Sequence, residues 1–255
     1  MKTGNRHFWW ATAMAAVLSA TACSTKKGGG EADKVISTEQ NMPGDSTVYG
    51  LACDGCNDTI LVFLPRTGGD PDTFNILGAS KQHQVFGRPM IGDKLAVVVN
   101  RENPKVADMV IDLEELKGEW CYMVTPRLRE RAGMSISANR REMTEEMDSI
   151  FREMMQPREY GMEIKSGHIA RPIGMVRTTT SDEESPVELP PLKRYREWRI
   201  FNGRLILNET SRDTSGVTTV INSDTARLIL LRRDTLVLCF CDGSEQGYYR
   251  RSTNE

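Results

Sequence analysis

Apolar residues in the first half of the chain gather in short continuous runs that begin and end at turn residues. Residues 59–64 read TILVFL, residues 95–99 read LAVVV, and a third stretch covers residues 106–112. Runs of this length with β-branched and aromatic residues are typical of buried strands. Asn-Asp, Gly-Asp and Asn-Pro pairs precede them and indicate turns. We therefore expect residues 47–113 to form either a small β-domain or the leading strands of a larger one.

The second half of the chain contains short strand-like segments at regular spacing. Asn202-Gly203 separates two of them and is a residue pair that two-residue β-hairpin turns favour. The segments predicted as strands are residues 160–164, 169–176, 195–201, 204–207, 216–221, 225–231, 235–240 and 247–250. Many short strands with a turn every 8–12 residues or so are typical of an antiparallel barrel or sandwich. The fold class expected from this pattern is all-β.

One amphipathic helix interrupts the strand pattern within residues 137–156. Good helix formers fill this segment, and Pro157 ends it. Its apolar residues recur at helical spacing and form one face, made of Met143, Met147, Ile150, Phe151 and Met154. We favour the interpretation that this is the core face of an ordinary helix, because methionine fills irregular gaps. The alternatives are a plastic surface for a ligand or partner, a lid on a barrel mouth, and a copper(I) site.

The N-terminal segment has the architecture of a secretory signal peptide. Lys2 and Arg6 supply a short positive region, and an apolar, small-residue run over residues 8–22 follows. That run is too short to span a bilayer as a typical helix. It ends in Ala-Thr-Ala directly before Cys23, as a cleavage site does. We expect residues 1–22 to be removed.

Small residues directly before Cys23 resemble the lipobox of bacterial lipoproteins, although Ala20 stands where that family favours leucine. The resemblance implies that Cys23 becomes the first mature residue and carries acyl chains such as palmitate. Ordinary signal cleavage without a lipid is the alternative. Residues 23–46 are polar, with three consecutive glycines and no aromatic residue, so we expect a flexible tether.

The lipoprotein resemblance also predicts a location. Multiple acyl chains would hold the chain firmly at a membrane, and we expect the outer membrane of the cell envelope. In lipoproteins of Bacteroidetes an acidic patch after the lipidated cysteine resembles a surface-export signal. Residues 24–27 read STKK and depart from that pattern. The periplasmic face is therefore favoured over the cell surface.

Composition and charge narrow the classes of function. Of the 255 residues, 39% are hydrophobic, which is enough for a core. The net charge of −2 gives no overall basic character of the kind that a nucleic-acid partner would require. No glycine-rich phosphate loop, HExxH or GxSxG motif appears. We therefore expect no enzymatic activity and no cofactor. His168 and the Arg250-Arg251 pair are expected at exposed turns or strand ends.

Four short motifs between residues 114 and 250 occur in an order that resembles a known family. They are Gly118-x-Trp120, GMEIKSGHIA at residues 161–170, YREW at residues 195–198 and LIL at residues 205–207. This order resembles the small lipocalin-like lipoproteins of Bacteroidetes, and it implies a lipocalin-like antiparallel barrel over residues 114–255 with the helix inserted. Trp120 and Trp198 would then close one end of the barrel or simply fill its core.

Cys53-x-x-Cys56 is the one cysteine motif in the chain. Its surroundings, with Gly50 before it and apolar residues after it, resemble the NlpE-like envelope lipoproteins of copper homeostasis and stress over about twenty residues. A structural disulfide across the turn is the interpretation that we favour in an oxidising envelope. A redox centre and a thiol metal site remain alternatives, but zinc normally takes four ligands, and only His83 and His168 remain after signal cleavage. We expect no bound metal.

These observations together predict a membrane-anchored, non-enzymatic binding or structural module of the cell envelope. The partners expected are a small apolar ligand or an envelope protein. The residues predicted to form the barrel core or to contact a ligand are Trp120, Trp198, Met143, Met147 and Phe151. The alternative function is an envelope redox or copper sensor that uses Cys53 and Cys56.

Overall fold

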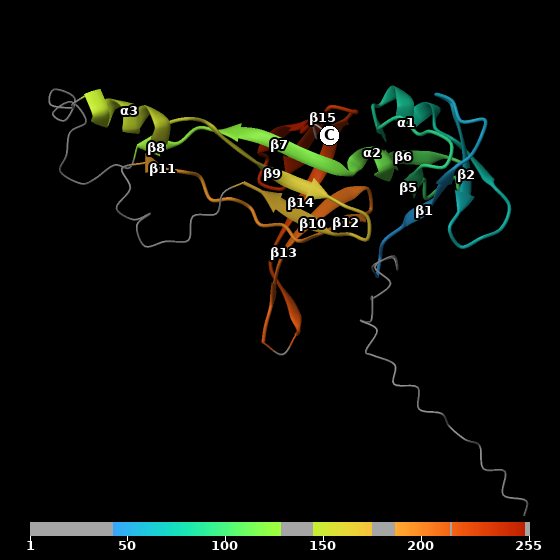
Figure 1. Ribbon diagram of the computed structural model, residues 1–255. Helices are drawn as coiled ribbons and strands as arrows, with labels where there is room; N and C mark the ends of the chain where they lie inside the picture. Colours follow the sequence, from blue (N-terminus) through green and yellow to red (C-terminus); the bar gives the residue numbers. More distant parts are fainter. Residues whose placement is uncertain (1–42, 129–144, 175–186, 215, 253–255) are drawn as a thin grey trace, which may run out of the picture. The chain divides into compact units, whose positions relative to one another are not determined.

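The structure, a computed structural model, describes residues 43–128, 145–174, 187–214 and 216–252 (Figure 1). The predicted signal peptide, most of the tether, Cys23 and Met143 lie outside these described residues. Within them the chain is an all-β protein with three short helices. The fold class expected from the strand pattern is confirmed.

The first sheet is built from residues 47–112. Its strands are β1 (Thr47–Ala52), β2 (Ile60–Pro65), β3 (Asp72–Asn75), β4 (Val85–Phe86), β5 (Lys94–Val99) and β6 (Ala107–Asp112), in the spatial order β3-β2-β1-β5-β6-β4. A short helix, α1 (Leu77–Lys81), joins β3 to β4. The sheet has its own buried cluster, in which Phe63 and Phe74 meet edge to face with ring centroids 5.7 Å apart.

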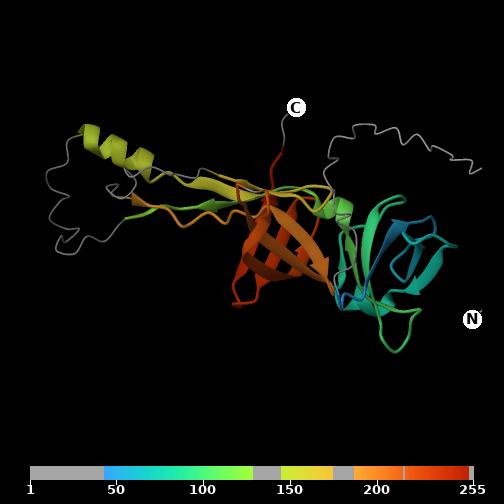
Figure 2. The ribbon, with the colours of Figure 1, turned by 90° about the horizontal axis from the view of Figure 1, so that it is seen from below.

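The second sheet has eight strands, each antiparallel to its neighbours, and it curls into a nearly closed barrel. The strands are β7 (Gly118–Val124), β9 (Arg158–Ile164), β10 (Ala170–Ile173), β12 (Glu197–Phe201), β13 (Arg204–Arg212), β14 (Thr218–Leu231), β15 (Thr235–Phe240) and β16 (Glu245–Arg250). Their spatial order is β10-β9-β7-β16-β15-β14-β13-β12, so the last strand in the sequence, β16, pairs with the first, β7. In Figure 2 the orange and red strands of residues 197–250 wrap round one another.

The two edges of this sheet, β10 and β12, meet through a few backbone contacts. An isolated antiparallel bridge joins Ile169 to Glu197. The amide of Ala170 donates to the carbonyl of Arg196 at 2.8 Å, and the amide of Trp198 donates to the carbonyl of His168 at 2.9 Å. These bonds pair the two edges near the start of each strand, which shortens the exposed edge that an open sheet would present.

The inserted helix, α3 (Glu145–Met154), lies beyond the barrel strands together with the short pair β8 (Arg127–Leu128) and β11 (Val187–Glu188) (Figure 1). Ile150 is 53% exposed, and Phe151 is half-buried rather than part of the core. The expectation that this helix turns a core face to the barrel is therefore wrong at these two residues. The reason is that β8 and β11 continue outward from the barrel and carry the helix past it.

A one-turn helix, α2 (Leu113–Leu116), connects the two sheets. The carboxylate of Asp112 caps it, because Oδ1 accepts hydrogen bonds from the amides of Glu114 at 2.9 Å and Glu115 at 3.0 Å. Gly87 packs against this cap: its φ is +89°, and a Cβ there would lie 2.6 Å from Asp112 Cβ. The cap is therefore sealed from solvent, and burial raises the pKa of Asp112 to about 6.

The first sheet also contributes to the core of the barrel. Phe86, Ala96 and Ile111 belong to the same buried cluster as Leu116 and Trp120. Backbone contacts add to this packing, since the amide of Gly87 donates to the carbonyl of Leu231 at 3.2 Å. Residues 47–112 therefore form a sheet with its own core on one side and share the barrel core on the other.

The buried cap predicts a specific dependence of stability on pH. Because the pKa of Asp112 is higher in the folded chain than in the unfolded chain, the folded state binds the extra proton between about pH 4 and 6. The stability from this group is therefore complete below its unfolded pKa and is lost as pH rises through 6. Asp112→Asn keeps a cap acceptor without the charge, so we expect it to raise the free energy of unfolding at pH 8 by about 1–3 kcal/mol.

Urea unfolding of both proteins at pH 4.5 and pH 8 measures this difference. Asp112→Ala is the control, because it removes the charge and the cap acceptor together, so it should be less stable than Asp112→Asn by about 0.5–2 kcal/mol at either pH. A lower stability of Asp112→Asn than of the wild type at pH 8 would contradict the prediction.

Candidate functional site

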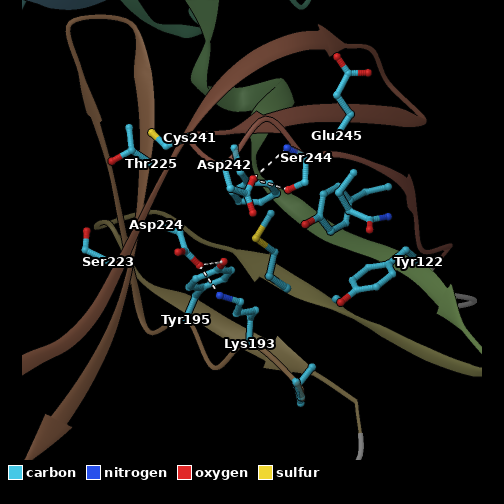
Figure 3. Close-up of a pocket in the computed structure, with 16 residues that line it drawn as sticks. Tyr122, Lys193, Tyr195, Ser223, Asp224, Thr225, Cys241, Asp242, Ser244 and Glu245 are labelled. Carbon is cyan, nitrogen blue, oxygen red and sulfur yellow. Dashed lines mark hydrogen bonds and ion pairs between the residues drawn. The ribbon is translucent and has the colours of Figure 1, made fainter. Parts of the chain in front are cut away.

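The barrel mouth holds a cavity of about 470 Å³. It lies among β7, β9, β14, the turn between β15 and β16, and the segment before β12 (Figure 3). Its lining consists of Tyr122, Gly161, Met162, Leu192, Lys193, Tyr195, Ser223, Asp224, Thr225, Phe240, Cys241, Asp242, Ser244, Glu245, Gln246 and Tyr248. The set combines aromatic and apolar side chains with charged groups, as ligand pockets do.

Tyrosine side chains form much of the inner wall of this cavity. Tyr122 meets Tyr248 edge to face with centroids 5.3 Å apart, and it meets Tyr160 in the same way at 6.3 Å. Burial, more than the neighbouring groups, raises the pKa of Tyr122 and of Tyr248 above the ordinary tyrosine value. Both hydroxyls therefore stay protonated at physiological pH and can donate hydrogen bonds into the cavity.

A charged group stands at one side of the cavity. The hydroxyl of Tyr195 donates to Asp224 Oδ2 at 2.5 Å, and Lys193 Nζ lies 3.0 Å from the same oxygen. Burial, followed by the hydrogen bond to Asp224, raises the pKa of Tyr195. In Figure 3 this group and Tyr122 lie on different sides of the cavity. The arrangement fixes the position of a carboxylate beside an aromatic wall.

The turn between β15 and β16 adds further negative charge. Asp242 Oδ1 accepts hydrogen bonds from Ser244 Oγ at 2.6 Å and from the Ser244 amide at 2.8 Å. These bonds lower the pKa of Asp242, so it stays ionised. Glu245 follows in the same lining. Three carboxylates and one lysine therefore surround the cavity, which makes its rim acidic.

The lining offers several kinds of groups that can bind a ligand. Neither described histidine, His83 or His168, belongs to it. Across the described ranges, no group of three or more His, Cys, Asp or Glu side chains is placed to hold a metal ion. Aromatic faces, hydroxyl donors and carboxylates remain, and these groups recognise a ligand by shape, hydrogen bonding and charge.

The tryptophans predicted from the sequence lie deeper than this cavity. Trp120 is fully buried and donates from Nε1 to the carbonyl of Leu116 at 2.7 Å. Trp198 is 4% exposed and donates to the carbonyl of Lys165 at 2.8 Å. Both indoles therefore have the polar partner that a buried tryptophan requires, and neither lines the cavity. They act as core residues.

Two residues expected at exposed positions are instead half-buried. Arg250 stacks its guanidinium over the Trp120 ring, 4.3 Å from the centroid. His168 lies against Trp198 with ring centroids 5.2 Å apart, and its Nδ1 is 3.1 Å from the Trp198 carbonyl oxygen. Both residues lie near turns or strand ends in the sequence, which is why exposure was expected. In the fold each of them packs against a tryptophan that is far away in the sequence.

Cys53 and Cys56 are free thiols in the structure, so the expected turn disulfide is not formed. Cys56 Sγ instead lies 3.1 Å from the Cys53 carbonyl oxygen and 3.4 Å from the Val62 amide nitrogen. Backbone groups of the turn and of the following strand are therefore the partners of the Cys56 thiol. Cys121, Cys239 and Cys241 are free as well.

Comparison with known proteins gives one similar solved structure. No family model and no curated protein matches the chain. The solved structure is that of a lipocalin-like protein from Bacteroides thetaiotaomicron. It is 19% identical, spans 53% of this chain and 95% of its own, and superposes with a TM-score of 0.26. The lipid anchor and the NlpE-like resemblance are not tested by this comparison.

The residues that form the cavity were not predicted, although a signal for some of them exists. Tyr122 lies two positions after Trp120 and therefore faces the same side of β7. Tyr195 begins the YREW motif, and this motif indicated a family resemblance rather than a binding residue. Tyr248 and Asp224 come from strands whose register only the folded barrel establishes. Of the predicted helix residues, Phe151 does not line the cavity, and the side chain of Met147 is not described.

The hydrogen bond between Tyr195 and Asp224 makes a prediction about stability. A buried hydroxyl that donates to a carboxylate contributes about 1.5–3 kcal/mol. We expect a double-mutant cycle of Tyr195→Phe and Asp224→Asn, followed by urea unfolding, to show a coupling energy of about 1–2 kcal/mol. Lys193→Gln is the control, because this exposed lysine should contribute less than about 1 kcal/mol. If the changes in the free energy of unfolding caused by Tyr195→Phe and Asp224→Asn were strictly additive, the result would contradict this hydrogen bond.

Proposed function

We propose that the chain is a non-enzymatic binding module of the cell envelope whose barrel mouth takes a small, largely apolar ligand. The observation that carries this proposal is the cavity of about 470 Å³ with a tyrosine-rich wall. Its volume lies within the roughly 300–1,000 Å³ common for ligand pockets. Tyr122, Met162 and Phe240 offer apolar contact, and the hydroxyls offer directional hydrogen bonds.

The acidic rim sets the polarity of the ligand that we propose. Asp224, Asp242 and Glu245 outnumber Lys193, and Lys193 is already paired with Asp224. A bound anion would be repelled by this rim, whereas a neutral or cationic polar end would be accepted. Tyrosine faces add to this preference, because aromatic rings attract cations.

The location in the envelope is part of the same proposal. The signal-like segment and the lipobox-like residues before Cys23 support an acyl anchor on that cysteine. Over the ranges for which coordinates are described, no helix is long and apolar enough to cross a membrane. We propose an outer-membrane lipoprotein held by lipids on Cys23, with the periplasmic face favoured.

Probe binding tests the proposed ligand site. We expect N-phenyl-1-naphthylamine, a neutral apolar fluorescent probe, to bind saturably to the mature protein. Thr225→Trp places a large ring in the cavity and should weaken probe binding about tenfold or more, since the ring occupies volume that the probe needs. Thr219→Trp is the matched control on the same strand, outside the cavity, and should leave binding unchanged. Absence of saturable binding, or equal affinities of the two variants, would contradict the proposal.

The anchor has its own test. We expect the intact mass of the purified mature protein to include acyl chains, and Cys23→Ser to lose them and to leave the membrane fraction, because stable attachment needs two or more chains. Cys53→Ser is the matched control and should keep both the added mass and the membrane fractionation. An unchanged mass in Cys23→Ser would refute lipidation of this residue.

A further inference from the structure

A second cavity, of about 640 Å³, lies at the seam between the first sheet and the barrel. From the first sheet, β1 and β2 contribute Tyr49, Leu51 and Leu64, and the start of β5 contributes Lys94. From the barrel, β12 contributes Arg199. The proposed ligand site at the barrel mouth shares none of its lining residues with this cavity. We call it the seam cavity.

The seam cavity has an extended apolar wall. Leu51, Leu64, Leu95, Leu113 and Ile200 all line it, and they come from both sheets. Leu51 is 37% exposed, although it lies within strand β1 and pairs with Leu64 and Lys94. Leu95 and Ile200 are already buried in the two cores. The apolar surface that gains free energy when a ligand covers it therefore belongs to Leu51, Leu64 and Leu113.

The charged residues of the seam cavity are mainly basic. Arg66, Lys94 and Arg199 carry fixed positive charge, and Asp45 is the one carboxylate in the lining. Asp45 is already engaged, since its Oδ1 accepts from the Thr47 hydroxyl at 2.6 Å and from the Asn202 amide at 2.9 Å. The lining therefore holds three basic side chains and one acidic side chain. No described carboxylate lies within salt-bridge distance of Lys94 or Arg199.

The two sides of the seam are fastened together beside the cavity. The hydroxyl of Tyr49 on β1 donates to the carbonyl of Ile200 on β12 at 3.0 Å. The amide and the hydroxyl of Ser46 both donate to Asn202 Oδ1, at 2.9 and 2.7 Å. These bonds hold the two walls at a fixed separation, so the cavity is formed before any ligand arrives, which lowers the cost of binding.

The geometry points to the seam cavity as a second binding site, for an anionic amphiphile with an apolar chain and a carboxylate or phosphate head. The leucine and isoleucine wall takes the chain, and Lys94 and Arg199 take the head. Lysine and arginine form short, charge-assisted hydrogen bonds with carboxylate and phosphate oxygens. The barrel mouth, with its acidic rim, would reject the same molecule. The inference therefore does not depend on the function proposed for that cavity.

A fluorescent fatty acid and its methyl ester distinguish the contribution of the charged head to binding from that of the apolar chain. The probes are 11-(dansylamino)undecanoic acid and its neutral methyl ester, titrated into the full mature chain. We expect Lys94→Gln with Arg199→Gln to weaken binding of the acid about tenfold or more, because two cations at the head are lost. Binding of the ester should change less than about threefold in the same variant.

Matched controls keep the result interpretable. Arg204→Gln with Arg227→Gln removes two cations from exposed, paired strand positions outside the seam and should leave both probes unaffected. Lys94→Gln alone, at an exposed position, should give a smaller loss of the same sign if the double variant proves unstable in a thermal melt.

Three outcomes would overturn the inference. The first is equal binding of acid and ester by the wild type. The second is loss of the acid in Thr225→Trp rather than in the Lys94 and Arg199 variant, which would place it in the barrel mouth. The third is flotation of Cys23→Ser protein on phosphatidylglycerol vesicles that is lost in the Lys94 and Arg199 variant and is not competed by the acid. That result would make these two cations a membrane contact.

Discussion

The stacking of Arg250 on Trp120 supports the weakest strand pairing inside the barrel sheet, on which the continuity of that sheet depends. The strands that meet here, β16 and β7, share only two register pairs, Tyr249 with Cys121 and Arg250 with Trp120. So short a ladder contributes few backbone hydrogen bonds. The Arg250 guanidinium lies over the indole and donates to the carbonyls of Lys117 at 2.7 Å and Glu115 at 2.5 Å, and also to that of Arg233. One side chain thus ties the last strand to α2 and to the turn before β15.

The position of the Arg250 side chain explains why glycine precedes the buried tryptophan by two positions. Gly118 has a φ of +140°, and a Cβ there would lie 2.2 Å from an Arg250 nitrogen. The glycine leaves room for the guanidinium to reach the carbonyls of α2. Because α2 also carries the Asp112 cap and joins the first sheet, the same small region holds both sheets together.

Local sequence patterns predicted the strands well wherever one face of a strand is buried. The run at residues 59–64 corresponds to β2 at Ile60–Pro65, and the Asn202-Gly203 pair forms the turn between β12 and β13 with both φ angles positive. Residues 216–221 and 225–231 were predicted as two strands, but they form the single strand β14. There the β13–β14 hairpin runs past the barrel core, so Val220 and Ile221 are exposed and the alternation that marks a half-buried strand disappears.

The two cavities lay beyond prediction because each is assembled across long stretches of sequence. Tyr122 meets Tyr248, and Lys94 faces the same cavity as Arg199, only after the strands take their register. The overall net charge of −2 conceals this arrangement, since acidic groups gather at the barrel mouth and basic groups gather at the seam. A near-neutral total argues against a polyanionic partner such as nucleic acid, but recognition of a small molecule depends on the local field. In this fold the charged lining groups are mainly acidic at the barrel mouth and mainly basic at the seam, and the ligands proposed for the two sites differ in charge for this reason.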